Sequence, residues 1–329
     1  MKNIKKITLG LGTVVLGASI LASCGNNTPT SNPSNENQNT KTTQALSDKK
    51  IVCYTRDTAS GTRDGFFTGI SFKDAVKSNA GLVSGYQEVA SNGDMITSIK
   101  NDENGIGYIS LASLGESGLK GLYYNDVEPT EENVLNGTYK LTRNFNYITR
   151  NDDAETTSGK IVRAFIAYLG TVDGKTIVKN NSGIINVEPS DPTWDSIKNN
   201  YSITSSDNSS TTIVIAGSTS VKSITSKIIP AFSKLCGNFK YEFAQNGSGD
   251  AYKRTQGSEK DGNNRADLAF ASREFELATT ESAASGTYGK MCTDAIVAVV
   301  NNKNSYSKTT SEILKNIYSG VTTKWNELK

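Results

Sequence analysis

The sequence predicts an α/β fold with two lobes and mainly parallel sheets, and three observations lead to this prediction. Short runs of β-branched residues alternate with amphipathic stretches, which is typical of strand–helix–strand units with parallel strands. Roughly 280 residues follow a polar N-terminal stretch, enough chain for two lobes. Hydrophobic residues form 36% of the chain and charged residues 21%, the balance of a folded globular protein.

The first 24 residues, MKNIKKITLGLGTVVLGASILASC, predict export. Lysines precede an apolar run that is shorter than the ~20 residues of a membrane-spanning helix and contains three glycines. The tetrapeptide Leu21-Ala22-Ser23-Cys24 resembles the lipobox of bacterial lipoproteins. This implies a signal peptide over 1–23, a lipid on Cys24, and an extracytoplasmic protein held on the outer face of the bacterial cytoplasmic membrane. The alternative is an ordinary secreted protein with a stray cysteine.

Two polar stretches predict connecting segments. Residues 24–49 are rich in Asn, Ser, Thr and Gln, so they bury too little apolar surface to fold and are expected to form a disordered tether. A second polar stretch, 199–211, is expected to be an internal linker.

The remaining elements are predicted in chain order from their periodicity. A β-type run starts at Ile51, the stretch 159–171 predicts a helix that stops at Gly170, and 212–217 (TIVIAG) predicts a strand. A helix follows from Ser220, because apolar residues then recur every three or four positions: Val221, Ile224, Ile228, Phe232 and Leu235. The run 294–302 predicts a buried strand, and 311–320 predicts a helix closed by Gly320.

Composition excludes several kinds of site. The chain has no histidine, which removes Ser-His-Asp and Cys-His catalysis and histidine–metal sites. Cys53, Cys236 and Cys292 each lie in an apolar stretch and are expected to be small core residues, so we predict no metal and no cofactor. The net charge is +2 and becomes −1 without the three lysines of the leader, so no nucleic-acid partner is expected.

Three loops share one chemistry. Each follows a β-type run and precedes a helix: Ser60-Gly61-Thr62, Gly217-Ser218-Thr219-Ser220 and Asn246-Gly247-Ser248-Gly249. Small hydroxyl residues at a helix start offer free backbone N–H groups and neutral donors to an anion. Any one such loop is an ordinary helix cap, but three of them, with Arg56 just before the first, indicate an oxyanion site.

These motifs resemble those of the phosphate-binding subunit of bacterial ABC phosphate importers, the PstS family. IVIAGSTSVKSI, NGSGDAYKR and DAIVAVVNNKN resemble the N-terminal half of the family, and R-x-x-x-SGTR and GIGYISL resemble the C-terminal half. The resemblance implies a two-lobed periplasmic-binding-protein-like (type II) fold with a hinge. It also implies a solute-binding lipoprotein that captures inorganic phosphate between its lobes, partners the permease subunits of an ABC importer, and acts as a monomer without catalysis.

The halves stand in exchanged order relative to the family, which predicts a circular permutation. The inferred lobes are 50–148 plus 293–329, carrying the R-x-x-x-SGT loop, and 149–292, carrying the GSTSV and NGSG loops. The stretch 199–211 would then bridge the old termini. A truncated tandem duplication is the competing explanation.

The resemblance implies phosphate ligands in both lobes: Arg56, Ser60, Gly61, Thr62, Thr219, Ser220, Ser248 and Ser272. Ser272 is a departure, because some family members have an aspartate there that accepts the phosphate proton. Asp57 and Asp64 are substitute candidates, with solvated surface carboxylates as the alternative.

Other functions remain as alternatives. The site could take another tetrahedral oxyanion, sulfate or molybdate. A surface adhesin could use the same tether, lipid and fold. A Ser/Lys hydrolase lacks its motif, because Ser223, Ser226 and Lys227 occupy ordinary helix positions.

Overall fold

The computed structural model describes residues 47–328. The predicted signal peptide, the lipidation residue Cys24 and nearly all of the predicted tether lie outside the described residues. Within them, no helix combines the length and the apolar character needed to cross a membrane.

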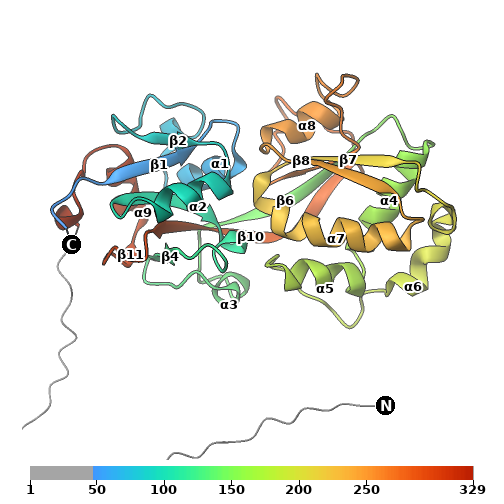
Figure 1. Cartoon of the computed structure of the whole chain (residues 1–329), viewed down its shortest axis with the longest axis horizontal. Coiled ribbons are helices and arrows are strands. Elements are labelled where there is room, and N and C mark those ends of the chain that lie inside the picture. The colour runs from blue at the N-terminus through green and yellow to red at the C-terminus, as the bar shows by residue number, and fades with distance from the viewer. Residues whose placement is uncertain (1–46, 329) are drawn as a thin grey trace, which may run out of the picture. The chain divides into compact units, whose positions relative to one another are not determined.

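The two largest hydrophobic clusters, each with a smaller one beside it, divide the elements into two groups, which we call the first lobe and the second lobe (Figure 1). The helices and strands of the first lobe are β1 (Val52–Arg56), α1 (Gly61–Gly69), β2 (Gln87–Val89), α2 (Asn92–Lys100), β3 (Gly105–Ser110), β4 (Lys120–Gly121), β5 (Tyr123–Tyr124), α3 (Glu131–Leu135), β11 (Lys308–Thr309) and α9 (Ser311–Tyr318). Those of the second lobe are α4 (Thr157–Leu169), α5 (Val172–Asn180), α6 (Trp194–Ile197), β7 (Thr212–Gly217), α7 (Lys222–Leu235), β8 (Lys240–Ala244), α8 (Gly249–Thr255) and β9 (Leu268–Ala271).

Two strands, β6 (Thr142–Thr149) and β10 (Tyr288–Val300), connect the lobes, and we call them the crossing strands (Figure 1). The strand order is β2-β1-β3-β10-β6-β9-β7-β8, with β4 also paired to β10. The outer pairs of this order are parallel, but β10 is antiparallel to β3 and β6, and β6 is antiparallel to β9. The prediction of mainly parallel sheets is therefore corrected to a mixed sheet with antiparallel pairing at its centre.

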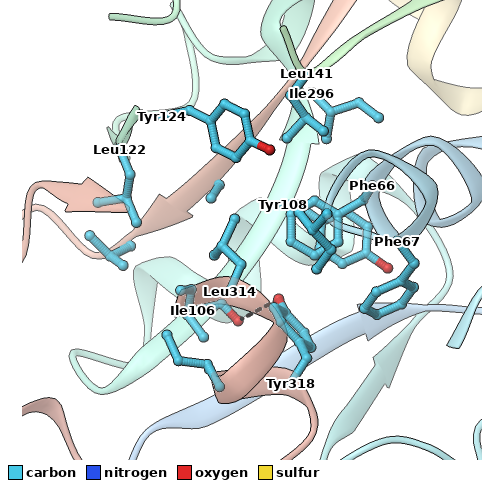
Figure 2. Packing of buried hydrophobic residues seen from close by; sticks show 14 of the residues in the cluster. Phe66, Phe67, Ile106, Tyr108, Leu122, Tyr124, Leu141, Ile296, Leu314 and Tyr318 are labelled. Carbon is cyan, nitrogen blue, oxygen red and sulfur yellow. Dashed lines mark hydrogen bonds between the residues drawn. The ribbon is translucent and has the colours of Figure 1, made fainter. Parts of the chain in front are cut away.

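Aromatic rings fill the core of the first lobe beside α1 (Figure 2). Phe66 stacks on Tyr108 with ring centroids 4.0 Å apart, and Phe67 packs edge-on against Tyr318. The buried Tyr318 hydroxyl donates to the carbonyl of Tyr54 at 2.9 Å, which satisfies its polar end. This packing holds α1 against β1 and β3, and it fixes the loop between β1 and α1.

Helix α7 packs on the second lobe largely through the predicted face. Val221, Ile224, Ile228 and Phe232 are fully buried. Leu235, the last residue of the helix, is 43% exposed, so its assignment to the buried face is corrected. The face turns to solvent there because the helix ends, with Cys236 as its C-cap.

The other predicted elements fall close to their expected bounds. Strand β7 matches 212–217, α4 ends at Leu169 with Gly170 as its C-cap, and α9 ends at Tyr318 just before Gly320, whose φ is +80°. Strand β10 begins six residues before the predicted Asp294 and ends at Val300. The stretch 199–211 holds a short 3₁₀ turn and is fastened by buried Asn208, whose amide donates to the carbonyl of Cys236.

The chain enters and leaves the described fold at one place in the first lobe. Lys50 bridges Lys324, and the Ile51 amide donates to the Thr323 carbonyl at 2.8 Å. The ends are thus held side by side at the edge of β1.

Cys53, Cys236 and Cys292 are buried and unbonded, as the sequence predicted for small core residues. Burial raises the pKa of the Cys53 thiol to about 12 and that of Cys236 to about 11. Both therefore stay protonated and unreactive at neutral pH.

Candidate functional site

The loops singled out in the sequence converge where the two lobes meet. Ser60 and Thr62 come from the first lobe, and Ser220, Ser248 and Ser272 come from the second; each is at most 3% exposed. The Thr62 hydroxyl lies 2.9 Å from that of Ser220, and the Ser248 and Ser272 hydroxyls are 3.0 Å apart. The structure therefore forms two buried hydroxyl pairs where the lobes meet, and we call these pairs, together with Ser60 at the start of α1, the enclosed site.

The first-lobe wall of this site is the start of α1. Ser60 is the N-cap, and its hydroxyl accepts from the Arg63 amide at 3.4 Å. Gly61 follows, and a Cβ atom there would lie 2.5 Å from Ser248 Oγ and 2.6 Å from Ser272 Oγ. Only glycine lets the helix start approach the second lobe this closely.

The second-lobe wall is built from three strand ends. Gly217 has φ +100°, and a Cβ atom there would lie 2.0 Å from the Phe270 carbonyl oxygen, so the turn after β7 requires glycine. Ser218 then accepts from the Ser220 amide and donates to Ser272 Oγ at 3.0 Å. The Ser272 amide in turn donates to Ser248 Oγ at 2.9 Å. Predicted Thr219 is placed differently, since it is only half-buried at the start of this turn.

Arg56 is buried beside the site, at 1% exposure. Its Nε donates to the Val89 carbonyl at 3.2 Å, and its Nη2 donates to the Ala90 carbonyl at 2.7 Å. Its Nη1 is buried without an acceptor among the described residues. Burial lowers the pKa of the Arg56 guanidinium, as does the nearby charge of Arg143, whereas Tyr108 and the Asp57 carboxylate, 3.9 Å from Nη2, raise it. Arg56 is thus a buried cation that an anion would stabilise.

Arg143, on crossing strand β6, is a second buried guanidinium that the sequence analysis missed. Its Nε donates to Asp294 Oδ2 at 2.9 Å, and its Nη2 donates to Ser220 Oγ at 3.0 Å. Like Arg56, it has an Nη1 that is buried without an acceptor among the described residues. Burial lowers the pKa of the Arg143 guanidinium, whereas the Asp294 carboxylate raises it.

Asn92 is the second functional side chain that sequence reasoning missed. It opens α2 after the N-cap Ser91 and is 4% exposed. Its Nδ2 donates to Ser220 Oγ at 3.0 Å, while its Oδ1 is buried without a partner in the described part of the chain. A signal was present, because Ser91-Asn92-Gly93 is a fourth strand–loop–helix junction of the same kind. Arg143 gave no such signal, since it lies inside a strand.

A cleft of about 520 Å³ lies beside the enclosed site. Arg143 and Ser272 belong to both the site and the cleft. Charged side chains surround the cleft, and Lys77 lies 3.4 Å from Glu276 across the two lobes. The enclosed site offers buried N–H and O–H donors, and no group of three or more acidic, Cys or His side chains within residues 47–328 could hold a metal ion. Such a set of donors can bind an oxyanion.

Comparisons with known proteins identify the family. The PBP superfamily domain matches residues 12–171 and 202–329. The phosphate-binding protein PstS 2 of Streptococcus agalactiae is 30% identical over all of this chain and 99% of its own length. This chain belongs to the PstS family. PstS 2 of Streptococcus pneumoniae is 29% identical over 98% of this chain.

A solved structure extends the family match to the fold. The crystal structure of a phosphate ABC transporter, phosphate-binding protein from Streptococcus pneumoniae TIGR4, is 27% identical, with a TM-score of 0.60. It covers 85% of this chain and 100% of its own. The two-lobed PBP-like fold is therefore confirmed, while the circular permutation of a PstS-family chain stays a prediction.

The carboxylates that could accept a phosphate proton in this PstS-family chain are already engaged. Asp57 accepts from the Ala59 amide at 2.9 Å and is about one-third exposed, and Asp64 pairs with Lys77 at 3.0 Å. Asp267, five residues before Ser272, accepts from the Val214 amide at 2.8 Å. Ser272 itself stands in the site as a neutral hydroxyl.

Proposed function

We propose that this protein captures inorganic phosphate between its two lobes and delivers it to an ABC-type phosphate importer. The observation that carries the proposal is the pair of buried guanidinium nitrogens, Arg56 Nη1 and Arg143 Nη1, that have no acceptor among the described residues. The relatives' names support the same ligand and transporter class. These names denote binding proteins, which agrees with capture without chemical conversion.

The main energetic cost of binding is the removal of water from phosphate, and the hydrogen-bond donors of the site offset this cost. Each oxygen needs a replacement donor, and hydrogen bonds to charged groups contribute about 1.5–3 kcal/mol each. Hydroxyls from Ser60, Thr62, Ser248 and Ser272 and the two guanidinium groups are the donors we assign, while the predicted ligand Ser220 orients Thr62, Asn92 and Arg143 around the anion. The backbone N–H of Gly61 and the side chain of Thr219 complete the predicted set.

Residues of the two lobes are in direct contact beside the site, so a ligand bound there can favour closure of the lobes. Thr62 meets Ser220, and the Gly249 amide donates to the Ala59 carbonyl at 3.1 Å. Phosphate held by both walls would add to these contacts and shift the protein toward a closed form. We propose that the closed form is the one that docks on the membrane permease.

The test is calorimetric titration with phosphate of the purified protein, which we expect to be a monomer that binds one phosphate. Arg56→Ala should abolish detectable binding, a loss of at least about 100-fold, because it removes a charge-assisted donor from a dehydrated site. Arg163→Ala, which alters an exposed side chain on α4, should bind normally. Tight binding of sulfate or molybdate with no heat from phosphate would overturn the phosphate assignment and leave an oxyanion site.

Extracytoplasmic anchoring is a further part of the proposal. Cys24 in its lipobox-like tetrapeptide supports lipid attachment, and two acyl chains suffice for stable membrane association. Cys24→Ser should release the protein from the membrane fraction and remove the lipid mass. A protein that fractionates with membranes equally well after this substitution would contradict the anchor.

A further inference from the structure

Three polar side-chain atoms at the site are buried and unpaired within residues 47–328, and they are not all of one kind. Arg56 Nη1 and Arg143 Nη1 are donors, whereas Asn92 Oδ1 is an acceptor. An unpaired buried polar atom is costly unless a ligand satisfies it. The site is therefore short of two acceptors and of one donor.

The contacts of Asn92 explain why its oxygen is the atom left over. Ser220 Oγ receives Asn92 Nδ2 and Arg143 Nη2, each at 3.0 Å, and lies 2.9 Å from Thr62 Oγ1. With two nitrogen donors on it, the Ser220 hydroxyl gives its own hydrogen to Thr62. The amide nitrogen of Asn92 is thus held on Ser220, and its oxygen is free for another donor.

Tetrahedral dianions differ in whether they can supply that donor. Hydrogen phosphate has one O–H and three bare oxygens, whereas sulfate has four bare oxygens. Serine and threonine hydroxyls can rotate to serve either ion, and guanidinium groups donate to both. Only a fixed acceptor distinguishes the two ions, because it pairs with an O–H and leaves a sulfate oxygen facing another lone pair.

We infer that Asn92 Oδ1 accepts the O–H of hydrogen phosphate and makes the site prefer this ion to sulfate. The inference rests on the proposed function. Asn92 is a neutral acceptor, so it adds no negative charge opposite a dianion. The buried carboxylate nearest to Arg143 cannot compete, because Asp294 Oδ1 accepts from Ser110 at 2.8 Å and Oδ2 accepts from Arg143.

The test is calorimetric titration with inorganic phosphate and with sulfate, above neutral pH, where phosphate is mainly the singly protonated dianion. The wild-type protein should bind phosphate at least about tenfold more tightly than sulfate. Asn92→Ala should weaken phosphate binding by about 10–100-fold and sulfate binding much less, so the preference falls. Asn146→Ala is the matched control, since this equally buried amide donates to Arg273 O outside the site and should leave the preference unchanged.

A second variant separates recognition from folding. Asn92→Asp keeps an acceptor of the same size but adds a negative charge, so both ions should bind more weakly while the phosphate preference is kept or increased. An unchanged preference in Asn92→Ala, or a lost one in Asn92→Asp, would overturn the role of Asn92 and leave the proposed function standing. A wild-type protein that binds neither ion would overturn both.

Discussion

At the scale of single residues, Ser220 joins the parts of the site. Its hydroxyl contacts Thr62 and Asn92 of the first lobe and Arg143 of a crossing strand, although Ser220 itself belongs to the second lobe. This oxygen atom can keep all of these contacts only when the two lobes are together. Small side chains around it allow this approach, and Gly61 is the smallest.

Gly61→Ala should weaken phosphate binding by about 10–100-fold, because the new Cβ would lie 2.5 Å from Ser248 Oγ when the lobes meet. Rotating Ser248 away would break its hydrogen bond with the Ser272 amide. Calorimetry measures the loss, and thermal unfolding without phosphate should show a nearly unchanged protein. The control is Gly93→Ala at the start of α2, where the nearest atom to the new Cβ is 3.5 Å away. Equal binding by both variants would contradict close contact at Gly61.

Sequence reasoning found most of the site residues near strand ends, although it missed Asn92. Arg56 ends β1, and Ser60, Ser220, Ser248 and Ser272 follow strands, where small polar residues are conspicuous. The structure brings them together, and their contact with phosphate stays a prediction. Arg143 is different, because a lone arginine inside a strand is indistinguishable in sequence from a solvent-facing one. Its burial depends on Asp294, which is 151 residues away.

At the scale of elements, the crossing strands combine a structural and a binding role. Asp294 on β10 is fully buried and ion-paired with Arg143 on β6, 2.9 Å from its Nη2. Burial raises the pKa of the Asp294 carboxyl, while Arg143 and Ser110 lower it. The pair holds Arg143 toward Ser220 and balances its charge when the strands pack.

Asp294→Asn should lower the free energy of unfolding by about 3–5 kcal/mol, because it leaves Arg143 buried without its carboxylate. Phosphate should restore more stability to this variant than it adds to the wild type, since the anion supplies the missing charge. Urea unfolding with and without phosphate measures both effects. Asp126→Asn removes an exposed pair with Lys308 and should change stability by less than about 0.5 kcal/mol. A similarly small effect at Asp294 would contradict the importance of the buried pair.

The crossing strands are also where element prediction from sequence fell short. The apolar second half of β10 was predicted from Asp294 onward, but its first half, from Tyr288, mixes polar and apolar residues without a regular period and was not recognised. Its antiparallel pairing with β6 joins segments far apart in the chain, so no local pattern reveals it. Local periodicity predicts individual helices and strands, whereas the pairing of strands depends on the tertiary fold.

At the scale of the whole molecule, the adjacent ends of the fold bear on the predicted permutation. Residues 49–51 and 323–325 are hydrogen-bonded to each other, so joining them demands little rearrangement. The stretch 199–211 contains exposed Ser209 and Ser210, where a chain could begin or end. Both features are those that a tolerated permutation needs.

A chain rejoined at these ends through a short glycine-serine linker and opened between Ser209 and Ser210 should fold. We expect a single cooperative melt that phosphate shifts upward, because all site contacts are retained. Opening the same chain between Ala295 and Ile296, inside β10, should prevent folding. Failure of the first chain to fold would contradict the interchangeable order of the halves. Success would show that the exchanged order is tolerated, and a truncated duplication would no longer be needed to explain it.

The α/β class with two lobes followed from sequence because strand and helix patterns alternate along much of the described chain, although α4, α5 and α6 follow one another without a strand between them. The exact lobe limits, predicted at 148/149 and 292/293, remain predictions; both fall within crossing strands, and β10 contributes residues to both cores. Along such a strand the packing partners change gradually from one lobe to the other. The amino-acid composition of the strand does not mark where this change occurs.

The shared entry and exit of the chain has a mechanical consequence. A pull on the residues upstream of Lys49 acts directly on the first lobe, through β1 and its contacts with the segment around Thr323. The second lobe carries none of that load and is joined to the first through β6 and β10. Arg56 and Asn92 would therefore keep their position relative to the point where the chain is attached. The wall formed by Ser220, Ser248 and Ser272 would move when the lobes open.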